Sequence, residues 1–154
     1  MNNTTDFSEY VLHNEKYHVL LCQQCKIGIP PTRVERHLRD EHKSIPIQIR
    51  NNMVEWASTL RLCEPNKVAT PPEEEGPIPY LELKEDGYQC RIENCRAFRS
   101  TEVGIEKHSY SHGWKKGEEK LWDVKCLQRF FNQGTHGKYI SYQIQLLMVD
   151  TSLY

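Results

Sequence analysis

At 154 residues, with 38% hydrophobic and 27% charged residues, the chain has the length and composition of about one soluble domain. Its formal net charge of −1 is not the strongly basic balance of a dedicated nucleic-acid binder. No apolar run approaches the roughly 20 residues that cross a bilayer, so no membrane partner is expected. The polar N-terminus carries no export signal, which favours a reducing intracellular compartment, nuclear or cytoplasmic.

The first predicted elements are a polar N-terminal arm over residues 1–16 and a zinc finger over residues 17–43. The β-rich stretch Tyr17–Cys22 predicts the first strand of the finger hairpin. Two consecutive prolines then disfavour helix, so a helix capped by Thr32 is expected to run through His42.

The finger contains a set of four metal-ligand residues. Two cysteines separated by two residues are followed, after eleven residues, by two histidines separated by four. A tetrahedral structural zinc ion needs four such ligands, and metal thiolates persist in a reducing compartment where disulfides do not. The wide histidine spacing requires an irregular last helical turn. The predicted zinc ligands are Cys22, Cys25, His37 and His42.

A connecting helix is expected over residues 44–63, because Met53, Trp56 and Ala57 recur at helical spacing. Its apolar face predicts either packing against the finger or a partner-binding surface around Trp56, and both alternatives stay open. Residues 64–79 are rich in proline and glutamate, which predicts an acidic loop.

A second zinc finger is expected over residues 80–114. Tyr80–Leu83 predicts a strand, Asp86–Gly87 a hairpin turn, and Ser100 or Thr101 the cap of a helix. The two histidines lie four positions apart, which places them on the same side of that helix. The predicted ligands of a second structural zinc ion are Cys90, Cys95, His108 and His112.

The C-terminal segment, residues 115–154, is aromatic and β-rich. Strands are expected over 121–131 and 139–144, with a turn over 132–137, while 145–149 stays open between strand and helix. The predicted fold class is therefore α+β, with two separated ββα C2H2-type fingers joined by a helix and an acidic proline-rich loop, and a β-rich C-terminal segment.

No catalytic site is expected, and the chain is not predicted to be an enzyme. Four Cys/His ligands close the zinc shell, whereas catalytic zinc keeps a position open for water. Cys63 and Cys126 are expected to be buried thiols, since no histidine and orienting group can be assigned to them. The remaining histidines are expected to be surface or packing residues: His13, His18 and His136.

The assembled motifs resemble a family of fungal zinc-finger proteins named for the orsellinic acid biosynthesis cluster protein D. The resemblance covers most of residues 10–142 and rests on Tyr17–His42, the helix with Trp56, Gly87–Cys90, His108–Trp114, Trp122 and Gln128–Phe131. It implies a zinc-binding module that occurs alone or beside recombinase-like or helicase-like domains. It brings no catalytic residues.

The first functional hypothesis is nucleic-acid binding, in regulation of transcription or DNA mobility, with the finger helices in a major groove. The base-reading positions would be Pro30, Arg33 and Arg36 in the first finger and Thr101, Gly104 and Lys107 in the second. However, 47 residues, positions 43 to 89, separate His42 from Cys90, whereas fingers that follow one groove need a short linker. The candidate nucleic-acid contacts are Arg33, Arg36, Arg39, Lys43, Arg99 and Lys107.

Two alternatives remain open. One is a zinc-stabilised protein-interaction module that uses the Trp56 helix or the aromatic C-terminal segment and binds no nucleic acid. The other is an accessory N-terminal part of a larger recombinase-like or helicase-like protein. No small-molecule substrate is expected in either case.

Overall fold

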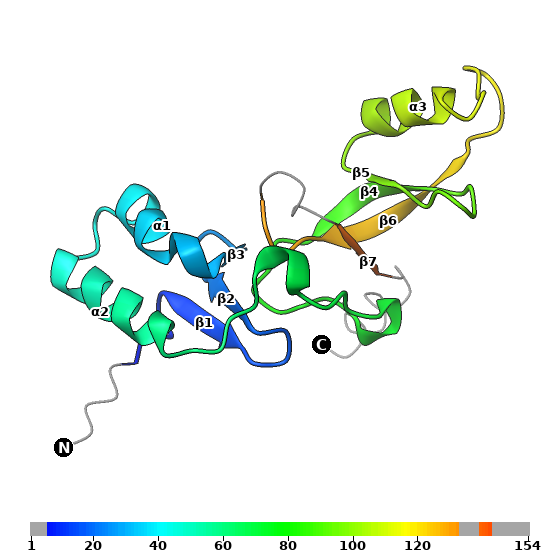
Figure 1. Ribbon diagram of the computed structural model, residues 1–154. Coiled ribbons are helices and arrows are strands. Elements are labelled where there is room, and N and C mark those ends of the chain that lie inside the picture. The colour runs from blue at the N-terminus through cyan, green and yellow to red at the C-terminus, as the bar shows by residue number, and fades with distance from the viewer. Residues whose placement is uncertain (1–5, 133–138, 143–154) are drawn as a thin grey trace, which may run out of the picture. The chain divides into compact units, whose positions relative to one another are not determined.

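The computed structural model describes residues 6–132 and 139–142 (Figure 1). Its contacts divide the chain into two compact units, each assembled from separated segments. Unit 1 comprises residues 1–70, 79–81 and 129–138, and unit 2 comprises the rest. Each unit contains one of the two predicted fingers, and the expected α+β class is confirmed by antiparallel sheets and three α-helices in the described part.

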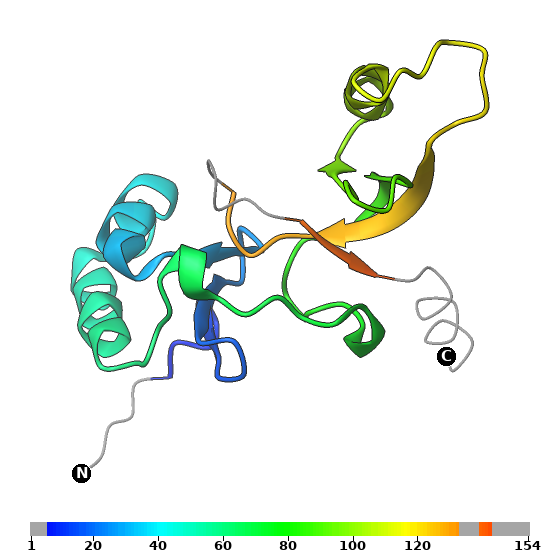
Figure 2. The same cartoon turned by 45° about the vertical axis from the view of Figure 1, so that its right-hand side comes forward.

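Unit 1 is built on a small antiparallel sheet in the order β1-β2-β3. Its strands are β1 (Val11–Asn14), β2 (Val19–Cys22) and β3 (Ile27–Ile29). Figure 2 shows the two helices of this unit lying side by side on one side of the sheet. The helical elements are η1 (Pro31–Arg33), α1 (Val34–Glu41), α2 (Ile47–Ser58) and the short η2 (Pro65–Lys67).

The core of unit 1 begins well before the predicted finger. Phe7 is 5% exposed, and its ring centroid lies 5.5 Å from that of Trp56 in α2. Val11 in β1 is also buried, so the expected polar arm over residues 1–16 is wrong for residues 6–16. These apolar side chains join the core that the sheet forms with α1 and α2, and β1 adds a third strand to the finger hairpin. Trp56 thus contributes to packing, which favours the first of the two alternatives for its helix.

The start of α1 differs from the prediction. Pro31 opens a 3₁₀ turn and the α-helix begins only at Val34. Thr32 makes no capping hydrogen bond to any described residue, and Arg33, at the N-cap position, has no side-chain cap bond either. The helix is held instead by its apolar face, since Val34 and Leu38 are both buried.

Unit 2 has a four-stranded antiparallel sheet in the order β5-β4-β6-β7. Its elements are η3 (Glu73–Glu75), β4 (Lys84–Cys90), β5 (Phe98–Arg99), α3 (Glu102–Tyr110), β6 (Trp122–Gln128) and β7 (Ile140–Tyr142). The two strands expected in the C-terminal segment are therefore present. They belong to the finger's own sheet, because β6 pairs along β4 from Lys84 to Cys90.

Gly87 was predicted to form a hairpin turn and lies instead inside β4. Residues 80–83, all described, form no strand, and β4 passes through Asp86–Gly87 with a register shift between Lys84 and Gly87. A Cβ at Gly87 would collide with the side chain of Leu127 in β6. The glycine is therefore required by the close approach of two strands rather than by a turn.

The core of unit 2 lies between the sheet and α3, and is formed by Cys90, Ile105, Trp114 and Trp122. At the other end of β6, the buried Gln128 side chain accepts a hydrogen bond from Ile78 N at 2.7 Å and donates one to Ile78 O at 3.0 Å. These two hydrogen bonds connect the end of the proline-rich loop to the sheet.

The remaining cysteines and histidines outside the two Cys/His groups differ in burial. Cys126 is 2% exposed, as expected of a buried thiol, whereas Cys63 is only half-buried. His13 and His18 are partly buried in and beside the β1–β2 hairpin. His136, most of the turn over 132–137, and the open element at 145–149 lie outside the described residues. Within the described part of the chain, no helix is long and apolar enough to span a membrane.

Candidate metal centres

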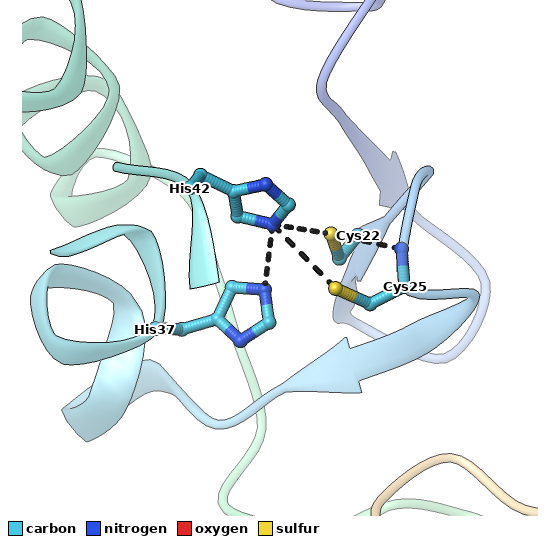
Figure 3. A group of neighbouring side chains, drawn as sticks. All are labelled: Cys22, Cys25, His37 and His42. Carbon is cyan, nitrogen blue, oxygen red and sulfur yellow. Dashed lines mark hydrogen bonds between the residues drawn. The ribbon is translucent and has the colours of Figure 1, made fainter. Parts of the chain in front are cut away.

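The first Cys/His group forms a tight cluster in unit 1 (Figure 3). Cys22 ends β2, Cys25 lies in the β2–β3 turn, His37 is in α1, and His42 directly follows α1. The His42 Nε2 atom lies 3.2 Å from Cys22 Sγ, 3.6 Å from Cys25 Sγ and 3.2 Å from His37 Nε2. All four donor atoms lie within 4.8 Å of one another.

These separations can be compared with the edges of a metal tetrahedron. Zinc bonds of about 2.3 Å to sulfur and about 2.0 Å to nitrogen give tetrahedral edges of about 3.3 Å between nitrogens and about 3.5 Å between nitrogen and sulfur. The measured distances at His42 are close to these values. The four side chains therefore fit a tetrahedral metal ion of the size of Zn²⁺.

The β2–β3 turn orients the two cysteines. The Cys25 N–H donates to Cys22 Sγ at 3.4 Å, and Lys26 N–H donates to Cys22 O at 2.9 Å. Lys26 adopts a left-handed conformation with φ of 56°. An amide N–H that donates to sulfur stabilises the thiolate that a metal requires, so the turn prepares Cys22 for metal binding.

His42 reaches the cluster because the helix ends at this residue. Its N–H still donates to Leu38 O at 3.1 Å, but its φ of −126° and ψ of 50° are no longer helical. The ring is buried, with 5% exposure. This is the irregular helix end that the spacing between the histidines requires.

The second group repeats the arrangement in unit 2. Cys90 ends β4, Cys95 lies in the β4–β5 connection, His108 is in α3, and His112 lies in the turn after α3. His108 Nε2 is 3.2 Å from Cys95 Sγ and 3.2 Å from His112 Nε2, and all four donor atoms lie within 4.8 Å. Arg96 follows the second cysteine with φ of 54°, as Lys26 does in unit 1.

The surroundings favour the uncharged forms of these groups when no metal is bound. In unit 1, burial raises the pKa of the Cys25 thiol to about 11, with further contributions from Cys22 and Glu41. Burial also lowers the pKa of His37, and the neighbouring His42 adds to this effect. A divalent cation would reverse the preference of the thiols, because a metal-bound sulfur is deprotonated.

The same pattern holds in unit 2. Burial is the main cause that raises the pKa of Cys90. Burial, followed by the positive charge of Arg99 and then His112, lowers the pKa of His108. A neutral imidazole is the form that ligates a metal, so His108 is prepared for this role at neutral pH.

Two of the four predicted nucleic-acid contacts in unit 1 pair with an acidic neighbour. Arg36 and Arg39 both contact the carboxylate of Asp40, at 3.6 Å and 3.1 Å. Lys43 is exposed beyond the end of α1, and Arg33 is exposed at its start. Because α1 also carries exposed Glu35 and Glu41, its solvent face bears both signs of charge.

In unit 2 two of the three base-reading positions, Thr101 and Gly104, hold the start of the helix. The Thr101 hydroxyl accepts a hydrogen bond from Gly104 N at 3.0 Å, which makes Thr101 the predicted helix cap. Arg99 donates to the carbonyl of Phe98 at 2.7 Å, and Lys107 is exposed on α3.

Unit 1 also contains a pocket of about 730 Å³ that sequence reasoning missed. All of Pro30, Arg33 and Arg36, the predicted base-reading positions of the first finger, line it. Residues 64–65 and 131–132, which are remote in sequence, also line it. The one available signal was the aromatic pair ending at Phe131, but its place beside the first finger depends on the tertiary fold.

Comparison with known proteins identifies the family. A family model described as orsellinic acid/F9775 biosynthesis cluster protein D matches residues 9–113, a range that contains both Cys/His groups. A curated protein of that description from Emericella nidulans is 30% identical over 128 residues, which cover 82% of this chain and 24% of that protein. The chain thus spans about a quarter of the length of this relative. No solved structure matches the chain. Since the family match extends over more than half of its length, the chain belongs to the orsellinic acid/F9775 biosynthesis cluster protein D family.

Proposed function

We propose that this chain is a protein-recognition module whose two units are each stabilised by one structural Zn²⁺. The observation that carries the proposal is the convergence of two thiols and two imidazoles within 4.8 Å in each unit. Four protein ligands complete a tetrahedral shell and leave no position for a reacting water, so we infer a structural rather than a catalytic metal.

The binding of a DNA duplex is the competing function, and the shape of unit 1 argues against it. A finger reads DNA when the outer face of its helix enters the major groove. Here Arg33 and Arg36 line a pocket that residues 64–65 and 131–132 help to enclose. A duplex that approached α1 would meet these two segments, the first of which carries the carboxylate of Glu64.

Charge supports the same conclusion. Affinity for nucleic acid depends on cations that neutralise phosphates, and each such contact adds to the salt dependence of binding. Asp40 already pairs with both Arg36 and Arg39. The formal net charge of −1 gives no general attraction to compensate.

The role within a longer protein is a separate matter. The curated relative is named for a biosynthesis cluster, and this chain corresponds to 24% of its length. We propose that the module serves as an accessory part of such a larger protein and contributes recognition rather than catalysis. A continuous reading frame with recombinase-like or helicase-like motifs would support the third alternative described above.

Two measurements test the proposed function. Fluorescence anisotropy of labelled duplex and single-stranded oligonucleotides should show no binding by the zinc-loaded chain at physiological salt. Binding that weakens steeply as salt rises, and that is reduced in Arg33→Ala, would instead establish nucleic-acid recognition. Selection from a peptide phage library should enrich sequences on the zinc-loaded chain and not on Cys22→Ser; failure to enrich any sequence would count against a protein-recognition role.

A further inference from the structure

The pocket in unit 1 has a preformed apolar floor. Ile29 of β3 and Phe131 are buried, with 2% and 4% exposure. The segment that carries Phe131 is fixed to the strand, because Gly28 N–H donates to Phe130 O at 2.6 Å. A Cβ at Gly28 would lie 2.5 Å from that same oxygen, so only glycine permits this approach.

The rim of the pocket carries charge of both signs with an acidic excess. Its charged lining consists of two arginines against three carboxylates, namely Arg33, Arg36, Asp40, Glu41 and Glu64. The Asp40 carboxylate is already paired with Arg36 at 3.6 Å. His37, which also lines the pocket, would be a neutral metal ligand, and a zinc ion with two thiolates and two imidazoles has no net charge.

The unpaired carboxylates belong to different elements. Glu41 is the last residue of α1, and Glu64 immediately precedes η2. Neither has an ion-pair partner among the residues that the structure describes. A cation that entered the pocket would therefore find carboxylates without displacing an existing pair, whereas a phosphate would be repelled by them.

We propose that this pocket binds a protein segment that presents a lysine or arginine side chain next to an apolar side chain. The apolar residue would lie on the floor of Ile29 and Phe131, and the cation would approach Glu41 and Glu64. This assignment rests on the proposed protein-recognition function and gives it a site and a partner chemistry. It also accounts for the base-reading positions of the first finger, which here form one wall of a peptide site.

The experiment uses the zinc-loaded full chain, labelled with ¹⁵N, and two capped dipeptides as probes. Acetyl-leucyl-arginine methylamide should shift the amide resonances of Ile27, Gly28 and Asn132 in a saturable manner. Acetyl-leucyl-glutamate methylamide should bind at least about threefold more weakly. Equal or tighter binding of the glutamate probe, or shifts confined to residues outside the pocket, would overturn the proposal.

Matched variants locate the effect. Glu64→Gln should weaken binding of the arginine probe about two- to fivefold, the range expected for one exposed ion pair. Glu35→Gln, on the same helix as Glu41 but outside the pocket lining, should leave it unchanged. If both variants behaved alike, the carboxylates of the pocket would not be the binding groups.

The outcomes separate this site from the broader function. If phage-selected peptides bind the chain but the arginine probe does not shift the pocket resonances, the pocket assignment fails and the recognition function stands. If a DNA duplex shifts the α1 resonances and displaces the selected peptides, the recognition function itself fails.

Discussion

Cys25 and His37 show how the folded chain prepares a metal site at the scale of single residues. Burial raises the pKa of the Cys25 thiol to about 11 and lowers the pKa of His37, so both groups are neutral near pH 7. Two neutral thiols and two imidazoles in contact supply little binding energy to one another. A structural zinc ion can supply on the order of 10 kcal/mol in units of this size, which makes metal binding and folding one event.

Loss of a single thiol should remove one metal ion. Cys22→Ser and Cys90→Ser are each expected to bind about one zinc ion instead of two, because three ligands hold zinc poorly and serine does not form the anion. Native mass spectrometry and elemental analysis measure the ratio. Cys63→Ser, a half-buried cysteine outside both clusters, is the control and should keep two. A chain that folds without metal would contradict the assignment.

Zinc binding should depend on pH through the thiols. Each centre is expected to release about two protons per zinc ion at pH 7.5, so affinity should rise about 100-fold per pH unit near neutrality. The lowered pKa of His37 and of His108 means that these rings have already lost their protons at this pH. Protons compete with the metal for these rings only as the pH falls further, and this competition weakens zinc binding in acid.

Calorimetry in buffers of different ionisation enthalpy counts the released protons. A release near zero, or an affinity that does not change between pH 6.5 and 7.5, would show that the thiols are not the ligands. The same titration on Cys90→Ser isolates the first centre.

At the scale of elements, the two finger helices begin in different ways. In α3 the Thr101 hydroxyl accepts from Gly104 N at 3.0 Å, which satisfies one of the free amides of the first turn. α1 has no such side-chain cap bond: a 3₁₀ turn that begins at Pro31 leads into the helix, and Thr32 caps no described amide. The sequence predicted Thr32 as one cap and Ser100 or Thr101 as the other, because residue type alone cannot show where the backbone becomes helical.

This difference gives a matched pair of substitutions. Thr101→Ala should destabilise unit 2 by about 1 kcal/mol, the usual effect of losing a cap bond. Thr32→Ala should change the stability of unit 1 by less than about 0.5 kcal/mol, as expected at an exposed position without a cap bond. Denaturant unfolding of the zinc-loaded variants measures both. Equal losses would indicate that the hydroxyl of Thr32 also caps its helix in solution.

At the scale of the whole molecule, neither unit is a contiguous stretch of sequence. Unit 1 takes Phe7 and Val11 from before the finger, Met53 from α2, and Phe130 from near the other end of the chain. The Phe130 ring lies 5.5 Å from that of Tyr17. The finger over residues 17–43 therefore depends on apolar surface that its own sequence does not contain.

An isolated peptide of residues 17–43 should consequently bind zinc at least about tenfold more weakly than the first centre in the full chain. It retains all four ligands but loses the packing of Phe7, Met53 and Phe130, and a tenfold change needs only about 1.4 kcal/mol. Competition with a chromophoric chelator gives both affinities. The full-length Cys90→Ser variant is the reference, because only its first centre is complete, and equal affinities would show that the extra segments do not support the site.

The ligands of both candidate centres can be identified from the sequence alone. Ligand type, order and spacing named all eight side chains that the structure brings together, because a tetrahedral ion restricts which spacings can serve. Local patterns also placed α2, α3 and the strands β6 and β7, since helical and alternating periodicities are local properties.

The surroundings of the two centres depend on long-range contacts that appear only in the folded chain. The pairing of β6 with β4 and the hydrogen bond between Gly28 and Phe130 both join residues far apart in sequence. Gly87 was expected in a turn and lies in a strand, because the need for a missing Cβ came from Leu127 on a neighbouring strand. The pocket beside α1 has the same origin: its walls come from three separate parts of the chain, and no local pattern records which of them will meet.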